Sequence, residues 1–577
     1  MSRNRRSDWP GADELLFVPL GGAGEIGMNL NLYGHDGAWV MLDLGVSFAD
    51  EHLPGIDLVM PDPAFIVERR KDLLGLVLTQ AHEDHIGAVA HLWPQLQCPI
   101  YATPFTAALV RRKLDELELT DKVELHVVPL GGTIKLGPFE MTYITLTHSI
   151  LEPNAVAIRT PLGLVMHTGD WKIDPTPTLG DVTDIAALTR AGDEGVLAMV
   201  CDSTNVFSPG RSGSEAGVRT SLMELVGKMR GRVAITTFAS NVSRLATIAE
   251  VAEAHDRHLV LVGRSMRRIV SAARETGYLQ GLARILNEDE AGWLPPEKVL
   301  YLVTGSQGEP RGAMARIASG NHPHISFGRG DTVVFSSKMI PGNERPIAAV
   351  QNQLAAAGVD LITEKSHFVH VSGHPNRDEL ADMYRWVRPH ISVPVHGEAR
   401  HLAEHARLAR SLGIAEAPVI TNGDVLRLAP GRPEIVDRVK SGRLVLDGTR
   451  LVPEDDRGVV ERRKLAFNGQ LSLAVVVDDS GRLAVPPRVT AAGMPVLEDE
   501  KILVESIAEA IEVAVGKLDG RSRAKDDAID EAVRRAARRV ASSLTGKKPV
   551  CHVHIMRLPV AGARLALSGA RKKGEEA

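Results

Sequence analysis

The stretch that decides the fold is Leu76-Val-Leu-Thr-Gln-Ala-His-Glu-Asp-His-Ile-Gly87. Its apolar beginning predicts a buried strand, and the polar residues that follow predict a loop at the end of that strand. Three potential metal ligands, His82, Asp84 and His85, fall within four residues of this loop. Imidazole and carboxylate groups are the ligands that Zn²⁺ and Mn²⁺ take in proteins. The segment therefore predicts a metal site at the end of a buried strand.

Three further residues of the same chemistry also follow apolar runs: His148, Asp170 and His396. A lone histidine is more often a hydrogen-bonded core or surface residue than a ligand. A whole set of such residues, each at a strand end, favours a shared site instead. Six ligands are enough for two ions, which could activate a water and stabilise the charge of phosphodiester hydrolysis.

Asp43 follows the apolar run Val40–Leu42 and occupies a similar strand end. It could orient a ligand histidine through a hydrogen bond. It could equally be an ordinary aspartate that begins a turn. The sequence alone leaves both interpretations open.

The first two hundred residues alternate short apolar strands with helical stretches, which is an α/β pattern. The expected strands are Glu14–Pro19, Ala38–Leu42, Leu74–Leu78, Met141–Leu146, Leu164–His167 and Val196–Cys201. The expected helices among them are Gly87–Trp93 and Thr106–Glu116. Strands that end in Asp, His or Thr suit a site built at one edge of a sheet.

From about Ser208 the chain changes to a regular alternation of helices and strands, which predicts a separate, doubly wound domain. The expected elements are Glu215–Met229, Val233–Thr237, Val242–Ala254, His258–Val262, Lys298–Val303, Thr332–Phe335 and Arg345–Ala357. A second histidine-rich region then runs from His370 to His396. It returns the chain to the first domain.

The segment Pro430–Arg462 is polar, and we expect it to be irregular and to serve as a linker. A small α+β module should follow it, with strands at Leu471–Asp478 and Val550–Arg557 and helices at Glu505–Leu518 and Asp527–Leu544. The expected domain limits are 1–208 and 369–450 for the first domain, 209–368 for the inserted domain, 451–462 for the linker and 463–577 for the last module.

Composition restricts the class of protein. The net charge is −5, which excludes a surface coated in positive charge but leaves room for a local basic groove. Three distant cysteines, Cys98, Cys201 and Cys551, form no metal-type pair and indicate a reducing compartment. No run approaches the roughly 18 apolar residues of a membrane-spanning helix. We expect a soluble cytoplasmic protein without membrane attachment.

These motifs resemble the metallo-β-lactamase fold, an αββα sandwich whose signature is H-x-H-x-D-H with later His, Asp and His. The resemblance places Asp43 in the first motif and residues 80–85 in the second, and it assigns His148, Asp170 and His396 to the later ones. It implies two divalent metal ions, expected to be Zn²⁺, with Mn²⁺ or Mg²⁺ as alternatives. The implied ligands are His82, Asp84, His85, His148, Asp170 and His396, with Asp170 bridging the two ions.

Gln80 departs from this pattern, because it stands where the signature has its first histidine. A glutamine amide is a weak, neutral ligand, so we expect impaired metal binding and turnover. A natural variation and a deliberate change that traps an inactive form both fit this position. The otherwise intact ligand set favours the deliberate change.

The inserted domain narrows the resemblance to the β-CASP nucleases, and the order of the motifs resembles bacterial ribonuclease J. The motifs are Cys201-Asp-Ser-Thr-Asn205, Thr237-Phe-Ala-Ser-Asn241, Val262-Gly-Arg-Ser-Met266, Thr304-Gly-Ser-Gln-Gly-Glu-Pro310, Ser336-Ser-Lys-Met-Ile-Pro-Gly342 and His370-Val-Ser-Gly-His374. The catalytic set that the resemblance implies is Asp43, Asp84, Asp202 and His374. In that set His374 is a candidate to protonate the leaving oxygen.

Two loops offer hydroxyls, an amide and backbone N–H groups, which suit a terminal phosphate. They are Ala239-Ser240-Asn241 and His370-Val371-Ser372-Gly373-His374. Taken alone, such loops are also ordinary turns. Basic candidates for RNA phosphates are Arg264, Arg267, Arg268 and Lys338, although Arg267 and Arg268 fit a solvated helix face as well. Aromatic residues make up only 4% of the chain, which argues against a large base-stacking platform.

The resemblance implies a metal-dependent ribonuclease with 5′-to-3′ exonuclease activity on 5′-monophosphorylated, single-stranded RNA and with endonuclease activity. It also implies a homodimer or homotetramer and partners in an RNA-degradation complex. Two other functions remain open. One is hydrolysis of another ester, such as a lactone or thioester, and the other is RNA binding by a chain that has lost catalysis.

Overall fold

The computed structural model describes residues 9–50, 52–340, 342–495 and 500–558. The chain divides into two compact units, one made of Met1–Phe48 and Leu58–Leu446 and the other of Ala49–Asp57 and Asp447–Ala577. Among the described helices, none combines the length and apolar character that a membrane span requires.

Two large sheets form the centre of the first unit. In spatial order the first contains β23 (Glu434–Arg438), β22 (Asp424–Ala429), β1 (Leu15–Gly21), β3 (Leu30–His35), β4 (Ala38–Leu42), β7 (Leu73–Val77), β8 (Ile100–Ala102) and β9 (Leu125–Val127). The second contains β10 (Thr133–Leu136), β11 (Phe139–Thr145), β12 (Asn154–Thr160), β13 (Gly163–His167), β14 (Val196–Asp202) and β20 (Ile391–Val395).

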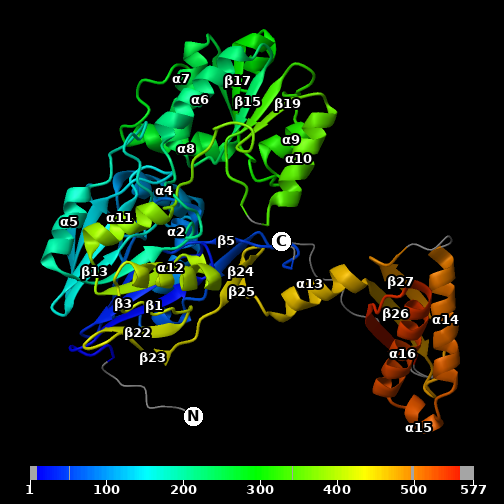
Figure 1. Ribbon diagram of the computed structural model, residues 1–577. Helices are drawn as coiled ribbons and strands as arrows, with labels where there is room; N and C mark the ends of the chain where they lie inside the picture. Colours follow the sequence, from blue (N-terminus) through cyan, green and yellow to red (C-terminus); the bar gives the residue numbers. More distant parts are fainter. Residues whose placement is uncertain (1–8, 51, 341, 496–499, 559–577) are drawn as a thin grey trace, which may run out of the picture. The chain divides into compact units, whose positions relative to one another are not determined.

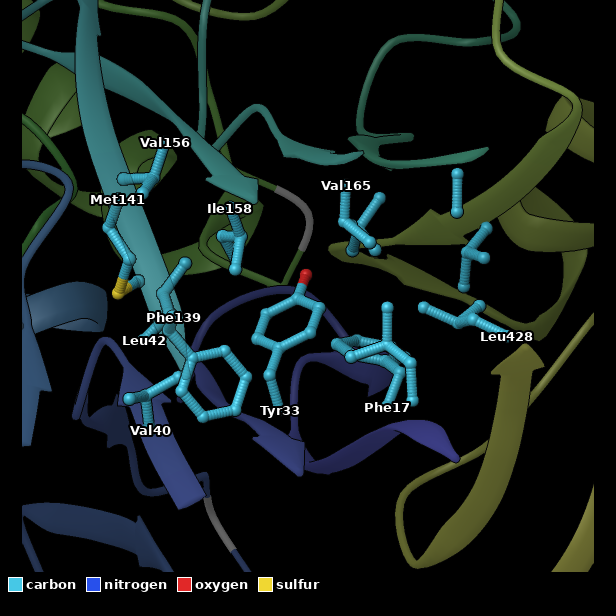
Figure 2. Packing of buried hydrophobic residues seen from close by; sticks show 14 of the residues in the cluster. Phe17, Tyr33, Val40, Leu42, Phe139, Met141, Val156, Ile158, Val165 and Leu428 are labelled. Atoms are coloured by element: carbon cyan, nitrogen blue, oxygen red, sulfur yellow. The ribbon is translucent and has the colours of Figure 1, made fainter. Parts of the chain in front are cut away.

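The inner faces of the two sheets share one hydrophobic core. Phe17 and Tyr33 from the first sheet pack in the same buried cluster as Phe139, Ile158 and Val165 from the second (Figure 2). Strands with one inward and one helix-covered face are apolar on both sides, which explains why these runs are almost continuously hydrophobic. This core fixes the positions of the strand ends.

Helices cover the outer face of the second sheet. α5 (Ile185–Glu194), α11 (Arg377–Val387) and α12 (Ala399–Ser411) contribute buried residues to a cluster with the outward side chains of that sheet. On the first sheet, α4 (Pro104–Glu116) packs against β8 and β9. The predicted αββα sandwich is confirmed.

The inserted domain is a five-stranded parallel sheet with helices around it (green in Figure 1). Its strand order is β16 (His258–Val262), β17 (Val299–Val303), β15 (Val233–Thr236), β18 (Thr332–Phe335) and β19 (Asp360–Thr363). The helices are α6 (Glu215–Lys228), α7 (Val242–Ala254), α8 (Arg264–Glu275), α9 (Ala313–Ala318) and α10 (Glu344–Ala356). The doubly wound architecture is confirmed, while its limits, 209 and 368, stay a prediction.

The second unit contains the three-stranded sheet β27 (Arg488–Ala492), β26 (Gln470–Val477) and β28 (Val550–Arg557). Helices α14 (Glu500–Gly516) and α16 (Asp526–Thr545) supply the rest of its core. Alternating burial along β26 shows that only one face of this sheet is packed. The predicted α+β module is confirmed.

The prediction of an irregular segment at 430–462 is wrong. This segment contains β23, β24 (Arg443–Asp447), β25 (Arg450–Pro453) and the start of α13 (Arg457–Asn468). Most residues of these strands are exposed or half-buried, so they lack the apolar alternation that marks a strand in sequence.

Removing a core side chain should test the packing between the two sheets. Ile158 lies in the middle of β12 and is fully buried. Ile158→Ala should lower the free energy of unfolding by about 2–5 kcal/mol, because it leaves a cavity between the sheets. Val182→Ala, at a position that is 54% exposed, should change it by less than about 0.5 kcal/mol. Urea denaturation of both variants gives the comparison, and equal destabilisation would contradict this packing.

Candidate metal centre and active site

A tight turn after β7 places the ligand candidates. His82 precedes the one-turn helix α2 (Glu83–Ile86), which carries Asp84 and His85. Loop 44–46 pairs with this turn, since Leu44 N donates to His85 O and Val46 N donates to Glu83 O. A Cβ at Gly45 would lie 1.7 Å from Asp84 O, so only glycine allows this close approach.

His85 lies between two buried carboxylates. Its Nδ1 donates to Asp43 Oδ2 at 2.7 Å, and its Nε2 is 2.9 Å from Asp170 Oδ2. Asp43 also accepts from Thr79 N and Thr79 Oγ1, both at 2.8 Å. Burial alone would lower the pKa of His85, but the carboxylates of Asp170, Asp84 and Asp43 raise it well above its ordinary value. Asp43 therefore makes the contact that the orienting role requires, and that role stays a prediction.

Four of the predicted ligands meet at one point. Donor atoms of Asp84, His85, Asp170 and His396 all lie within 4.8 Å of one another. His396 Nδ1 is 2.8 Å from Asp170 Oδ1, and its Nε2 is 3.6 Å from Asp84 Oδ2. With His85 Nδ1 held by Asp43, the Nε2 nitrogen faces the other ligands. This arrangement of two imidazoles and two carboxylates fits a divalent metal ion.

His82 and His148 form a second group beside the first. His148 Nδ1 donates to Gly373 O at 2.5 Å, so its Nε2 carries the lone pair and accepts from His82 Nδ1 at 3.1 Å. Burial, with the nearby His374 as a smaller cause, lowers the pKa of His148 to about 3, which keeps this lone pair available. His148, Asp170 and His374 also bring donor atoms within 4.8 Å of one another.

Gln80 is buried beside His85. Its Nε2 lies 3.0 Å from His85 Nε2, and its Oε1 has no hydrogen-bond partner among the described residues. A buried acceptor without a partner is costly, by about 1–3 kcal/mol. An amide at this position supplies neither an imidazole nitrogen nor a charge. The group of Asp84, His85, Asp170 and His396 therefore fits a divalent ion. Beside His82 and His148, Gln80 offers an amide at the position where the metallo-β-lactamase signature has a histidine.

Asp202 and His374 form a pair at the end of β14. His374 Nδ1 donates to Asp202 Oδ2 at 2.8 Å, while Asp202 Oδ1 accepts from Thr204 N and Oγ1. Burial alone would lower the pKa of His374, but the Asp202 carboxylate raises it above its ordinary value. The ring of His374 lies beside the candidate ligand imidazoles, with its centroid 5.1 Å from that of His148 and 5.5 Å from that of His396.

The loop 370–374 lies against the metal ligands. Gly373 O holds His148, and Asn205 Nδ2 donates to Ser372 Oγ at 2.7 Å and to His374 O at 3.1 Å. A Cβ at Gly373 would lie 2.8 Å from a ring carbon of His148, so a larger residue would displace the loop or the histidine. A group bound by this loop would therefore lie close to the metal ligands.

The other predicted phosphate loop, 239–241, lies at the start of α7. Asn241 is buried, and its Oδ1 caps the helix by accepting from Arg244 N, while its Nδ2 donates to Glu215 Oε1. Ala239 and Ser240 are half-buried. The Asn241 amide is thus engaged within the protein, as are the backbone N–H groups of Asn241 and Val242, which donate to Phe238 O and Ser240 O.

The basic candidates separate into two kinds. Arg267 contacts Asn287 and Glu288, and Arg268 pairs with Glu116, so both belong to ion pairs on the exposed face of α8. Arg264 is exposed at the start of that helix. Only Lys338 approaches the site, since its Nζ is 3.3 Å from Asn205 Oδ1.

Sequence reasoning missed one residue of the site, Asn29, and one exposed aromatic residue, Phe207. Asn29 Nδ2 donates to Asp84 O at 3.0 Å and lies within 3.4 Å of ring nitrogens of His85 and His396. Its loop, distant in sequence, gave no pattern to find it by. Phe207 is 51% exposed, with the Arg400 guanidinium 6.0 Å from its ring centroid. An apolar residue two positions after Asn205 was the only signal for it.

Four family descriptions match consecutive parts of the chain. They are beta-lactamase superfamily domain (39–191), Ribonuclease J beta-CASP domain (230–354), Zn-dependent metallo-hydrolase RNA specificity domain (358–419) and Ribonuclease J C-terminal domain (458–558). Together with the sandwich, the inserted domain and the site, they define a metallo-hydrolase of the metallo-β-lactamase type with a β-CASP domain.

Named relatives agree over most of the chain. A ribonuclease J of Sinorhizobium meliloti is 46% identical over 551 residues, which cover 95% of this chain and 98% of the relative. A ribonuclease J of Synechocystis is 37% identical and covers 86% of this chain and 78% of the relative, and one of Corynebacterium glutamicum is 38% identical over 88% and 71%. The chain belongs to the ribonuclease J family. The resemblance expected from the sequence is confirmed.

The bond between Asp43 and His85 should control metal affinity. Asp43→Asn keeps a residue that tolerates the positive φ of 62° at this position, but it removes the carboxylate that holds His85 Nδ1. We expect the affinity for Zn²⁺ or Mn²⁺ to fall about 10- to 100-fold, measured by competition with a chromophoric chelator.

Asp62→Asn is the matched control, because Asp62 is buried but contacts Ala64 N and Lys440 instead of a ligand histidine. Its metal affinity should equal that of the parent chain. Equal affinities of Asp43→Asn and the parent would show that Asp43 does not orient a ligand.

Proposed function

We propose that this chain is a metal-dependent ribonuclease that acts on single-stranded RNA with a 5′-monophosphate, exonucleolytically in the 5′-to-3′ direction and also internally. The observation that carries the proposal is the hydrogen bond that His148 Nδ1 donates to Gly373 O. It attaches a loop suited to a terminal phosphate directly to a metal-ligand group. The membership in the ribonuclease J family supports the same substrate class.

The metal ligands of the proposed site are His82, Asp84, His85, His148, Asp170 and His396, and the ions are expected to be Zn²⁺, with Mn²⁺ or Mg²⁺ as alternatives. When bound, such ions would activate a water for attack on phosphorus and offset the negative charge of the transition state. Donor atoms of Asp170 lie within 4.8 Å of those of Asp84, His85 and His396 and also of those of His148 and His374, which supports its role as the shared ligand.

His374 is the candidate general acid. The Asp202 carboxylate accepts from Nδ1 and raises the pKa of the imidazole, which favours the protonated form with a proton on Nε2. That proton can pass to the O3′ of the leaving nucleotide. The loop 370–374 would hold the 5′-phosphate of the same nucleotide, through Ser372 and backbone N–H groups.

RNA beyond this nucleotide would contact exposed groups near the site. Lys338 suits a phosphate, and the exposed ring of Phe207 with Arg400 suits stacking on one base. By family, we propose a homodimer or homotetramer and association with other proteins of RNA degradation.

A different ester substrate, such as a lactone, and RNA binding without catalysis remain the alternatives. The phosphate-type loop beside the ligands argues against the first. The six remaining candidate ligands argue against RNA binding without catalysis, because a site without function would be expected to lose more than the one histidine that Gln80 replaces. Each alternative predicts a different outcome in the assays that follow.

Gln80 should impair metal loading. Gln80→His restores the missing imidazole, so we expect elemental analysis to show more metal per chain in this variant than in the parent. The rate of RNA hydrolysis should rise with it. Equal metal content and equal rates in the two chains would contradict the role assigned to Gln80.

The 5′ end should control the reaction of the Gln80→His variant. With Mn²⁺ or Mg²⁺, RNA that carries a labelled 5′-monophosphate should release labelled mononucleotides, while the same RNA with a 5′-hydroxyl should react more slowly. Lactone hydrolysis without RNA cleavage would favour the first alternative. Absence of both activities, with RNA binding retained, would favour the second.

A further inference from the structure

A fully buried ion pair lies between the first two helices of the inserted domain. Arg244, on α7, has no exposed surface, and Glu215, on α6, is 3% exposed. Arg244 Nε donates to Glu215 Oε2 and Nη2 donates to Glu215 Oε1, both at 2.9 Å. Burial would raise the pKa of Glu215, but the Arg244 guanidinium holds it below its ordinary value. Both groups are therefore charged.

A buried ion pair of this kind contributes little net stability to the packing of two helices. Removing two charges from water costs several kcal/mol per ion, and apolar side chains of similar size often stabilise a fold as well or better. The third guanidinium nitrogen, Nη1, contacts residues outside both helices, and these contacts indicate a role for the pair beyond joining α6 to α7.

Arg244 Nη1 holds the chain just before the candidate phosphate loop. It donates to Val369 O and to Ser336 O, both at 3.0 Å. Ser336 Oγ donates to Val369 O as well, at 2.7 Å. Val369 directly precedes the loop 370–374, so the guanidinium and Ser336 set the position at which that loop begins.

Glu215 connects the same pair to the metal ligands. Its backbone N donates to Asp174 Oδ2 at 2.9 Å, and Asp174 forms a buried ion pair with Lys172 at 3.1 Å. Asp174 N donates to Thr147 Oγ1, which in turn donates to Lys172 O. Thr147 directly precedes the ligand His148.

We propose that Arg244 and Glu215 are a positioning pair that sets the distance between the phosphate loop 370–374 and the metal ligand His148. The pair touches neither substrate nor metal and acts through Val369 and Asp174. It therefore governs the preference for a 5′-monophosphate more strongly than the cleavage step, in which His374 of the same loop takes part. The consequence for substrate preference rests on the proposed function, whereas the positioning of the loop does not.

Arginine is required for this role because of its geometry. The guanidinium presents five donors in a rigid plane, which lets one side chain hold Glu215, Ser336 and Val369 together. A lysine ammonium at position 244 could keep the charge and a contact with Glu215, but it could not hold all three. Arg244→Lys thus separates the positioning role from the charge.

The first measurement is hydrogen exchange of the loop, detected by mass spectrometry, in the Gln80→His chain with and without Arg244→Lys. Amides of 370–374 should exchange faster in the Arg244→Lys variant. Ser336→Ala, which removes the hydroxyl and with it the contacts to Val369 O and from Arg244 Nη1, should give a smaller change in the same direction, because Arg244 keeps its bonds to Val369 O and Ser336 O. It also serves as the informative variant if Arg244→Lys fails to fold.

Arg219→Lys is the matched control. Arg219 and Glu250 also join α6 to α7, through an exposed ion pair that lies away from the loop. It should leave the exchange of 370–374 unchanged. Unchanged exchange in both Arg244→Lys and Ser336→Ala, or the same increase in Arg219→Lys, would overturn the positioning role.

The second measurement is the ratio of kcat/KM for 5′-monophosphate RNA to that for 5′-hydroxyl RNA. Arg244→Lys should lower this ratio about tenfold, the effect of one lost hydrogen bond to a charged group, through the KM of the phosphorylated RNA. Metal content should not change, and the rate on 5′-hydroxyl RNA should fall less than that on 5′-monophosphate RNA, because both reactions use His374 of the same loop. A folded variant with an unchanged ratio would overturn the role in 5′-end preference.

Failure of the proposed function gives a separate result. If the Gln80→His chain itself does not distinguish the two RNAs, the proposed 5′-end dependence is wrong. The exchange measurement still decides whether the pair positions the loop, because it needs no substrate.

Discussion

The site depends on one buried interaction, the imidazole of His85 held between Asp43 and Asp170. Asp43 directly follows β4 and His85 lies in the turn after β7, both in the first sheet, while Asp170 follows β13 in the second sheet. Two carboxylates at hydrogen-bond distance from one ring leave it a single orientation. Because the two sheets share one hydrophobic core, these strand ends cannot separate without opening that core. The hydrophobic packing and the ligand geometry are therefore parts of the same constraint.

Contacts spread from this centre to segments that are far apart in sequence. Asn29 ties the glycine-rich loop after β1 to Asp84 and His396. His148 attaches the loop 370–374, and from there Val369 and Arg244 reach the inserted domain. Each step is a hydrogen bond to a buried group, which is costly to leave without a partner. The inserted domain and the candidate metal ligands are thus linked by a continuous set of hydrogen bonds.

Much of the fold and most of the ligands could be predicted because they follow apolar strands. His85, Asp170 and His396 each come after a run that the hydrophobic pattern marks clearly, and parallel strand ends meet at one edge. Asn29 could not be predicted, since nothing in a glycine-rich loop shows which distant helix it will contact. The segment 430–462 was predicted wrongly because its strands are mostly exposed and carry no apolar alternation. The buried contacts of Arg244 also needed the structure, because its partners Glu215, Ser336 and Val369 lie on other elements.

Anomalous diffraction from crystals of the Gln80→His chain, grown with Mn²⁺ or Zn²⁺ and a 5′-mononucleotide, would show whether the candidate metal ligands and the phosphate loop form one site. We expect an anomalous peak among Asp84, His85, Asp170 and His396, with the nucleotide phosphate against the loop 370–374. A metal peak elsewhere, or a phosphate bound away from that loop, would contradict a single site.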